Sequence, residues 1–237
     1  MSAPYSTHVP ASAVVPPVRR PYAAVFRLLI ALAAATGIAI DLSLASPGRV
    51  LGYFTVQSNL LVALVLAVSA RRAWSGRPPL RPALTTAVLL YALTAGLVRH
   101  LLLSPLTTNG AAPGWHTLAD QLLHTAVPLA LLADWFLLTR PGGLRARHAL
   151  LWLLYPAAYL AFALLRGAAL SPGTPARYPY PFLDVPAHGY GGVLAGALLL
   201  GAFILALGLA LAGLDRLRPA VREPINRISP PGPGGLE

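Results

Sequence analysis

The stretch HGYGGVLAGALLLGAFILALGLALAG, residues 188–213, contains no aspartate, glutamate, lysine or arginine. Crossing the hydrocarbon core of a bilayer takes about 20 helical residues, so this stretch is long enough to span a membrane. Five other predominantly apolar runs of similar length precede it, at residues 22–44, 52–70, 83–104, 116–139 and 149–167. Ionisable residues interrupt the first and third of these runs: Arg27, Asp41 and Arg99. We therefore predict an all-α integral membrane protein, a bundle of six transmembrane helices without strands, because an open sheet edge cannot face lipid.

The composition of the 237-residue chain supports this fold class, since 56% of the residues are apolar and only 11% are charged. Soluble domains usually carry about 25% charged residues, and a soluble fold of this size could not hide so much apolar surface. The net charge of +11 comes entirely from arginine. Because the arginines lie in short clusters between apolar runs, they indicate membrane topology and not a nucleic-acid partner. The absence of cysteine excludes disulfides and thiolate chemistry.

The arginines fall on alternate connections between the apolar runs. Thirteen precede the first run or follow the second, fourth and sixth runs, whereas only Arg49 and Arg177 lie on the other three connections. Cytoplasmic loops carry the excess of positive charge in membrane proteins. The sequence therefore predicts a multi-pass protein of the cell membrane with both termini in the cytoplasm.

One alternative for the first run stays open. Arg19 and Arg20, the apolar run 28–40 and the small residues Ala45 and Ser46 together resemble a cleavable signal peptide. Cleavage would leave five spans and an external N-terminus. Against cleavage, Asp41 lies where a signal peptide is normally uncharged.

The chain divides into three parts. Residues 22–217 form the predicted six-helix membrane domain. Residues 1–21 and 218–237 are rich in proline, glycine or serine, and such segments bury too little apolar surface to offset the entropy of ordering them. We predict that they are disordered cytoplasmic tails.

With this orientation, most polar side chains inside the spans collect in the outer half of the bundle. The inner half holds chiefly Arg27 and Asp134, whereas the outer half holds Asp41, Thr55, Gln57, Ser58, Asn59, Arg99, His100, His116, Asp120, Gln121, His124, Arg166, Asp184 and His188. Ionisable groups in a span are costly, so they turn inward, pair and often mark function. The simpler interpretation of four that fall at helix ends is that they reach water: Arg99, Arg166, His116 and His188.

The fourth span carries the most specific of these patterns. His116, Asp120 and His124 follow one another at intervals of four residues, which places them on one helix face. His124 lies about 12 Å below His116 at 1.5 Å per residue, and Pro128 cannot donate a hydrogen bond to the His124 carbonyl, so a kink is expected there. Asp120 could fix the tautomer of His124, as carboxylates do in hydrolytic triads. The alternative is a buried His–Asp pair that only ties helices together.

The sixth span contains a Gly-x-x-x-Gly pattern. Gly192 and Gly196 are four residues apart, and Ala197 and Gly201 continue the small residues at similar spacing. Small residues let helix backbones approach closely. We expect this face to pack against another helix within the bundle.

The second span opens with Tyr53-Phe-Thr-Val-Gln-Ser-Asn59, an unusually polar start for a membrane helix. Taken alone, the Thr55 hydroxyl most simply bonds back to the carbonyl of the preceding turn, and the Asn and Gln side chains serve as interhelical hydrogen bonders.

Three segments together resemble the androgen-induced-protein family, which comprises multi-span membrane hydrolases that cleave fatty acid esters of hydroxy fatty acids. They are Tyr53-Phe-Thr55, Gly114-Trp115 followed by His124-Thr-Ala-Val-Pro128, and Tyr180-Pro-Phe-Leu-Asp184. The chain is also similar to small actinobacterial membrane proteins of the same general pattern. The resemblance implies that Thr55 matches the family's catalytic threonine and His124 its catalytic histidine. Around Asp120 the chain departs from the family, which has an Asn-His pair nearer the catalytic histidine.

These two lines of inference give one hypothesis, a lipid (fatty acyl) ester hydrolase near the outer membrane face. Thr55 would be the nucleophile and His124 the base that takes its proton, with Asp120 orienting the ring. Three side chains are candidates to stabilise the oxyanion: Gln57, Asn59 and Arg99. Because Thr55 starts its helix while His124 lies two turns into its own, we expect contact only if the second span begins several residues before 52. Membrane lipids and a fatty acyl ester are the expected partners.

Two other classes of function remain open. The outer half gathers four histidines that could hold zinc or haem iron, namely His100, His116, His124 and His188, but their spacing matches no tight metal motif and we predict no cofactor. A non-enzymatic bundle or a small-solute transporter is the second class. Separate, mutually distant polar pairs would favour a structural bundle, and one connected cavity would favour catalysis. The sequence leaves the oligomeric state open.

Overall fold

The computed structural model describes residues 18–103 and 114–218. The described residues are helical without strands, and they include six continuous helical segments that are long and apolar enough to cross a membrane. Some of these segments join consecutive elements named below. The helices are α1 (Pro21–Leu44), α2 (Pro47–Val50), α3 (Phe54–Trp74), α4 (Pro82–Val98), α5 (Trp115–Gln121), α6 (Val127–Leu138), α7 (Ala146–Trp152), α8 (Leu154–Ala169) and α9 (Val185–Leu217), with π-helical turns η2 (Arg99–Leu103) and η4 (Leu122–Ala126) and a 3₁₀ turn η5 (Pro181–Leu183). The predicted six-helix membrane bundle is confirmed. The two predicted tails lie almost wholly outside the described residues.

Two of the helices continue well beyond the apolar runs that predicted them, α3 at its end and α9 at both ends. α3 continues through Arg71 and Arg72 to Trp74, four residues beyond the run 52–70. Arginine is a good helix former, and at the end of a span its side chain can reach water. α9 begins at Val185 with Pro186 in its first turn, where the missing N–H of proline costs nothing. Hydropathy alone therefore did not locate the ends of these two helices.

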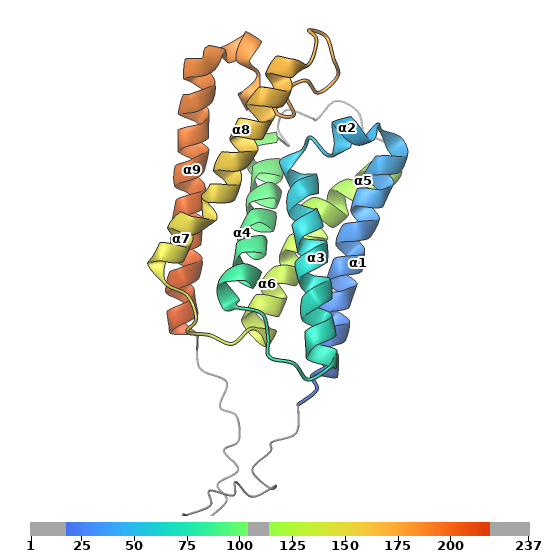
Figure 1. Cartoon of the computed structure of the whole chain (residues 1–237), viewed down its shortest axis with the longest axis vertical. Coiled ribbons are helices and arrows are strands. Elements are labelled where there is room, and N and C mark those ends of the chain that lie inside the picture. Colours follow the sequence, from blue (N-terminus) through green and yellow to red (C-terminus); the bar gives the residue numbers. More distant parts are fainter. Residues whose placement is uncertain (1–17, 104–113, 219–237) are drawn as a thin grey trace, which may run out of the picture.

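The core runs along the helices at the centre of the bundle. α3 lies between α1 and α4, and α4 also contacts α6 (Figure 1). Val62 and Leu66 of α3 and Leu89 and Leu90 of α4 are almost completely buried. Burying one such side chain stabilises a soluble fold by about 1.5–3 kcal/mol. In lipid that term is largely lost and close packing takes its place.

The small residues of α9 differ in how closely other helices approach them. Gly208 faces Ala149 and Trp152, and a Cβ at Gly208 would lie 3.2 Å from the Ala149 Cβ. At Gly196 and Gly201, by contrast, an added Cβ would meet no atom within 4 Å. The expectation that this small-residue face packs inside the bundle was therefore wrong. Gly201 instead lines the cavity described below.

The arginine-rich segments share one end of the bundle. Figure 1 shows the start of α1, the α3–α4 and α6–α7 connections and the end of α9 together at its lower edge. The backbone N–H of Arg20 donates to the Ala73 carbonyl at 2.9 Å. The Asp215 carboxylate accepts from the N–H groups of Gly142 and Leu144 at 2.9 and 3.0 Å. The residues that carry the predicted topology signal thus lie side by side.

Two buried ion pairs lie toward this end. Arg27 of α1 binds Asp134 of α6 with both donors of its fork, at 2.8 and 3.2 Å, and the two side chains are only 5% and 7% exposed. Arg218 binds Asp215 at 2.7 Å and lies over the ring of Trp135. Each charge is paired in a geometry that tolerates burial. The sequence had placed Arg27 and Asp134 in the inner half without predicting that they pair.

Candidate active site

Thr55 lies in the first turn of α3, and its side chain is directed at His124. The threonine is 6% exposed, and its Oγ1 is 3.0 Å from Nε2 of His124. This distance is within the normal range of a hydrogen bond between a hydroxyl and a ring nitrogen. The two residues that the sequence selected on different grounds therefore form one pair.

The contact forms although α3 begins at Phe54, later than residue 52. The condition that the helix must begin several residues earlier was wrong, because it assumed that all helices stand upright. Figure 1 shows α5 and α6 running obliquely across the bundle. Each residue of an inclined helix descends by less than the full 1.5 Å rise. His124 therefore lies nearer the level of Thr55 than a count of turns implies.

The other ring nitrogen of His124 fixes the tautomer. Nδ1 lies 3.1 Å from the Asp120 carboxylate and 3.2 Å from the Asp120 backbone carbonyl. Both groups only accept hydrogen bonds at neutral pH, so Nδ1 must carry the proton. Nε2 is then the free acceptor, and the Thr55 hydroxyl donates to it. Asp120 itself accepts from Arg99 Nε at 2.8 Å, so the chain of contacts runs from Arg99 to Thr55.

His124 sits in the middle of the π-helical turn η4, which ends next to Pro128. The sequence predicted a kink at Pro128, and the structure has a π-helical turn directly before Val127 and Pro128. Gly96 of α4 lies against this turn, since a Cβ at Gly96 would be 2.6 Å from the His124 carbonyl oxygen. π-Helical turns are often found at functional sites. Within this turn His124 faces Thr55 of α3, and Gly96 allows α4 to pass close to it.

Tyr180 adds a third functional group to the pair, one for which no role was predicted. Its hydroxyl accepts the backbone N–H of Thr55 at 3.3 Å and lies 3.4 Å from Thr55 Oγ1. Tyrosine is common at the membrane–water interface, but Tyr180 points into the bundle. Burial raises the pKa of the Tyr180 phenol above its ordinary value, so the hydroxyl keeps its proton. The only sequence signal for Tyr180 was its place in the segment Tyr180–Asp184, one of the three segments that carry the family resemblance.

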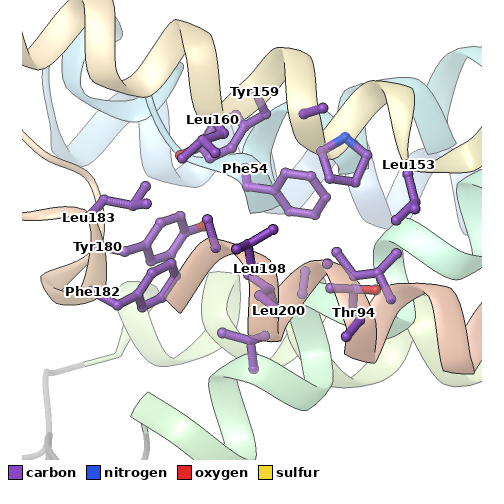
Figure 2. A pocket seen from close by; sticks show the side chains of 18 of the residues that line it. Phe54, Thr94, Leu153, Tyr159, Leu160, Tyr180, Phe182, Leu183, Leu198 and Leu200 are labelled. Atoms are coloured by element: carbon purple, nitrogen blue, oxygen red, sulfur yellow. The ribbon is translucent and has the colours of Figure 1, made fainter. Parts of the chain in front are cut away.

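An apolar cavity of about 430 Å³ opens beside these three residues. Figure 2 shows Tyr180, Phe182 and Leu183, from the segment before α9, at one end of the cavity and Leu153 at the other. Along α9 the lining extends from Leu194 to Leu205, which corresponds to about 16 Å. Five polar side chains line it within the described residues: Thr55, Thr94, His124, Tyr159 and Tyr180. The cavity is therefore apolar over most of its length and polar at the Thr55 end.

The three side chains considered for the oxyanion lie elsewhere. Gln57 donates to the Leu51 carbonyl at 2.9 Å on the exposed side of α3. Asn59 is buried and donates to the carbonyls of Thr55 and Leu123 at 2.9 and 3.3 Å. Arg99 is occupied by Asp120, and none of the three lines the cavity. The polar residues that the sequence analysis assigned to one half of the bundle thus fall into two sets. Some form hydrogen bonds within and between helices, and others line the cavity.

Comparisons with family models, with curated proteins and with solved structures found no match to this chain. The function has to be argued from the site itself. Among residues 18–103 and 114–218, no three histidine, cysteine, aspartate or glutamate side chains gather as metal ligands would. His100, one of the histidines considered for a metal, contacts Thr125 at 3.0 Å. What the arrangement can do is transfer a proton from the Thr55 hydroxyl to a correctly oriented imidazole beside an apolar cavity.

Proposed function

We propose that this membrane protein hydrolyses fatty acyl esters, with Thr55 as nucleophile and His124 as general base. The observation that carries the proposal is the 3.0 Å contact between Thr55 Oγ1 and His124 Nε2 at the polar end of an apolar cavity. A hydroxyl becomes an effective nucleophile when an adjacent base takes its proton. The resemblance to the androgen-induced-protein family supports the same two residues.

The reaction would proceed in two halves. Thr55 Oγ attacks the ester carbonyl carbon while its proton passes to His124 Nε2, and the carbonyl electron pair moves onto oxygen. Collapse of this intermediate breaks the ester C–O bond, and the alkoxide leaves as an alcohol with the proton from His124. Water, deprotonated by the same nitrogen, then attacks the acyl-threonine. This step releases the fatty acid and restores Thr55.

The cavity favours an acyl chain as the group bound. Ligand sites are mostly apolar with a few placed polar groups. Here the apolar wall includes Phe182, Leu198 and Leu205. A lipid ester would lay its chain along α9 with the carbonyl at Thr55. The connection from Arg99 to Tyr180 through one site also favours catalysis over a bundle whose polar pairs only tie helices together.

We further propose the orientation that the arginine distribution predicts, with the arginine-rich end in the cytoplasm and the site in the outer half. Alkaline phosphatase fused after residue 175 should be active, whereas fusions after residues 76 and 143 should be inactive. The reverse pattern would overturn this orientation. A purified protein that starts at Ser46 would show that the first span is a cleaved signal.

The function is tested with purified protein, a panel of long-chain acyl esters and a fluorophosphonate probe, which labels an activated hydroxyl. Wild-type protein should turn over at least one ester and be labelled. Thr55→Ala and His124→Ala should each lower kcat by at least about 10³-fold, and the double variant should be little worse, because the two residues act as a unit. The matched control is Thr94→Ala. It removes a hydroxyl that lines the same cavity but donates to the Leu90 carbonyl.

Two outcomes would count against the proposal. Full labelling and turnover in Thr55→Ala would remove Thr55 from the mechanism. A folded wild-type protein that neither reacts with the probe nor hydrolyses any ester would favour a transporter or a structural bundle instead.

A further inference from the structure

The proposed reaction needs a hydrogen-bond donor for the negative oxygen of the intermediate, and the cavity wall offers few. Of the polar side chains that line it within the described residues, Thr94 donates to the Leu90 carbonyl at 2.8 Å and Tyr159 to the Gly52 carbonyl at 3.0 Å. Thr55 donates to His124. The hydroxyl of Tyr180 is the remaining donor whose proton is not held by a backbone carbonyl.

We propose that Tyr180 is a further catalytic residue, whose phenol donates to the substrate carbonyl and stabilises the oxyanion formed when Thr55 attacks. The inference rests on the proposed function. Its geometric basis is that the phenol oxygen lies 3.4 Å from Thr55 Oγ1. Oxyanion donors stand about 2.7–3.1 Å from the developing negative oxygen. That oxygen and Oγ1 are bonded to the same carbon, so a donor this close to Oγ1 can reach it.

The Tyr180 hydroxyl has Thr55 Oγ1, 3.4 Å away, as the one acceptor for its proton among the described contacts, and this contact is long enough for the proton to turn to a substrate oxygen. The phenol oxygen already accepts the backbone N–H of Thr55 at 3.3 Å, so its own O–H is the donor left over. A hydroxyl that accepts a hydrogen bond becomes a stronger donor, because the bonds in a chain polarise one another. The N–H of Thr55, which alone would be a typical oxyanion donor, thus acts through the phenol.

Tyr180 is held in place before any substrate binds. Its ring stacks on Phe182, with centroids 5.2 Å apart and planes inclined by 7°, and meets Tyr53 edge-on at 5.7 Å. The loop that carries it is fixed by Arg166, which donates to the carbonyls of Ala176 and Arg177. A donor that needs no reorganisation during the reaction contributes most to transition-state stabilisation.

The test compares Tyr180→Phe with Tyr155→Phe on an ester that the wild-type protein turns over. Tyr155 packs in the same aromatic cluster, 5.2 Å from Phe54, and its buried hydroxyl has no hydrogen-bond partner among the described residues. Removing one oxyanion donor lowers kcat by about 10²–10³-fold. We expect that loss in Tyr180→Phe with KM little changed, and near wild-type kcat in Tyr155→Phe.

A second readout separates catalysis from structure. A long-chain alkylboronic acid adds to the Thr55 hydroxyl as a tetrahedral anion and mimics the intermediate, whereas the matching alkyl ether binds without reacting. Tyr180→Phe should weaken boronate binding at least about tenfold, since a lost hydrogen bond to a charged group costs about 1.5–3 kcal/mol, and should leave ether binding unchanged.

The outcomes are distinguishable. An active wild-type protein whose Tyr180→Phe variant keeps its kcat, or loses boronate and ether binding equally, overturns this inference alone. A loss of kcat shared by Tyr155→Phe also overturns it. A wild-type protein without any ester turnover overturns the proposed function and this inference with it.

Discussion

The arginine-rich half of the bundle, which is the predicted inner half, and the opposite half that contains Thr55, the predicted outer half, both bury polar side chains but in different ways. In the inner half, Arg27 and Asp134 meet through two hydrogen bonds at 5% and 7% exposure. In the outer half, Arg99 and Asp120 are 25% and 29% exposed and continue through His124 to Thr55 at an apolar cavity. The inner pair has no group left to react, whereas the outer chain ends in a hydroxyl whose proton has an acceptor.

The difference shows that a polar residue in a span is not by itself a sign of chemistry. Ionisable groups in membranes are costly and often mark function, but a pair that satisfies itself can simply join two helices. The outer half differs in two ways. Its polar side chains form one continuous chain of contacts from Arg99 to Thr55, and the last two side chains of that chain line a cavity. The predictions below perturb one half at a time.

The largest expected effect is on stability, at the inner pair. Arg27→Met leaves the Asp134 carboxylate buried without its partner, which should destabilise the protein by about 3–5 kcal/mol. Unfolding in mild detergent, followed by tryptophan fluorescence, measures the loss. Combining Arg27→Met with Asp134→Leu removes both charges and should recover most of it.

Activity provides the control for this comparison. The fraction of Arg27→Met protein that remains folded should hydrolyse ester at the wild-type rate, because the pair lies apart from Thr55. A stable Arg27→Met variant without activity would contradict the division into a structural half and a reactive half.

The sequence predicted the parts of this architecture that depend on one segment at a time. Six apolar runs predicted the six helices. The depth of His124 below His116, together with Pro128 four residues after it, identified the histidine at the site. The pairing of helices was beyond it, because the contacts of Thr55 with His124 and Tyr180 join residues 69 and 125 positions apart. Such contacts depend on helix tilt and rotation, which packing sets.

The surroundings of the α9 glycines and of Tyr180 could not be predicted, for the same physical reason. The small residues Gly196 and Gly201 were expected to pack in the bundle, but side chains from other elements decide which faces approach, and here they leave a cavity. Tyrosine commonly lies at the membrane–water interface, and Tyr180 does not. Its ring turns inward because Phe182 and Tyr53 pack against it, a preference that composition does not carry.

The second prediction perturbs the outer half without touching its polar groups. A Cβ at Gly96 would lie 2.6 Å from the His124 carbonyl oxygen, so Gly96→Ala must push η4 away from α4. A displacement of about 1 Å at a catalytic group can cost about 10²-fold in rate. We expect kcat to fall by up to that factor, measured on the best ester of the panel.

Gly213→Ala is the matched control, since a Cβ there meets no atom within 4 Å. Its kcat should stay at the wild-type value. If Gly96→Ala also keeps full activity, the position of His124 does not depend on close passage of α4.

The third prediction concerns the length of the acyl chain. Gly201 lines the cavity, and an added Cβ meets no atom within 4 Å there, so Gly201→Leu fills the cavity without a backbone clash. Each buried methylene contributes about 0.8 kcal/mol, so excluding two of them should lower kcat/KM for the longest chains about tenfold. Short-chain esters should be affected less. Gly213→Leu, on the same helix but outside the cavity, should leave the profile unchanged, and a uniform loss at all chain lengths in Gly201→Leu would argue against an acyl site.

The smallest expected effect is at Asp120, although it is the only acidic residue in contact with His124 among those described. Asp120→Asn keeps the shape of the side chain and loses its charge. In hydrolytic triads the same exchange costs about 10⁴-fold, because the histidine then adopts the wrong tautomer. Here the Asp120 backbone carbonyl also lies 3.2 Å from Nδ1, so the tautomer remains fixed. What is lost is the difference between an ionised and a neutral acceptor, about 1 kcal/mol, so kcat should fall about tenfold or less. A loss near 10⁴-fold would show that the carboxylate alone orients His124, and would make Arg99, which holds that carboxylate, part of the reactive chain as well.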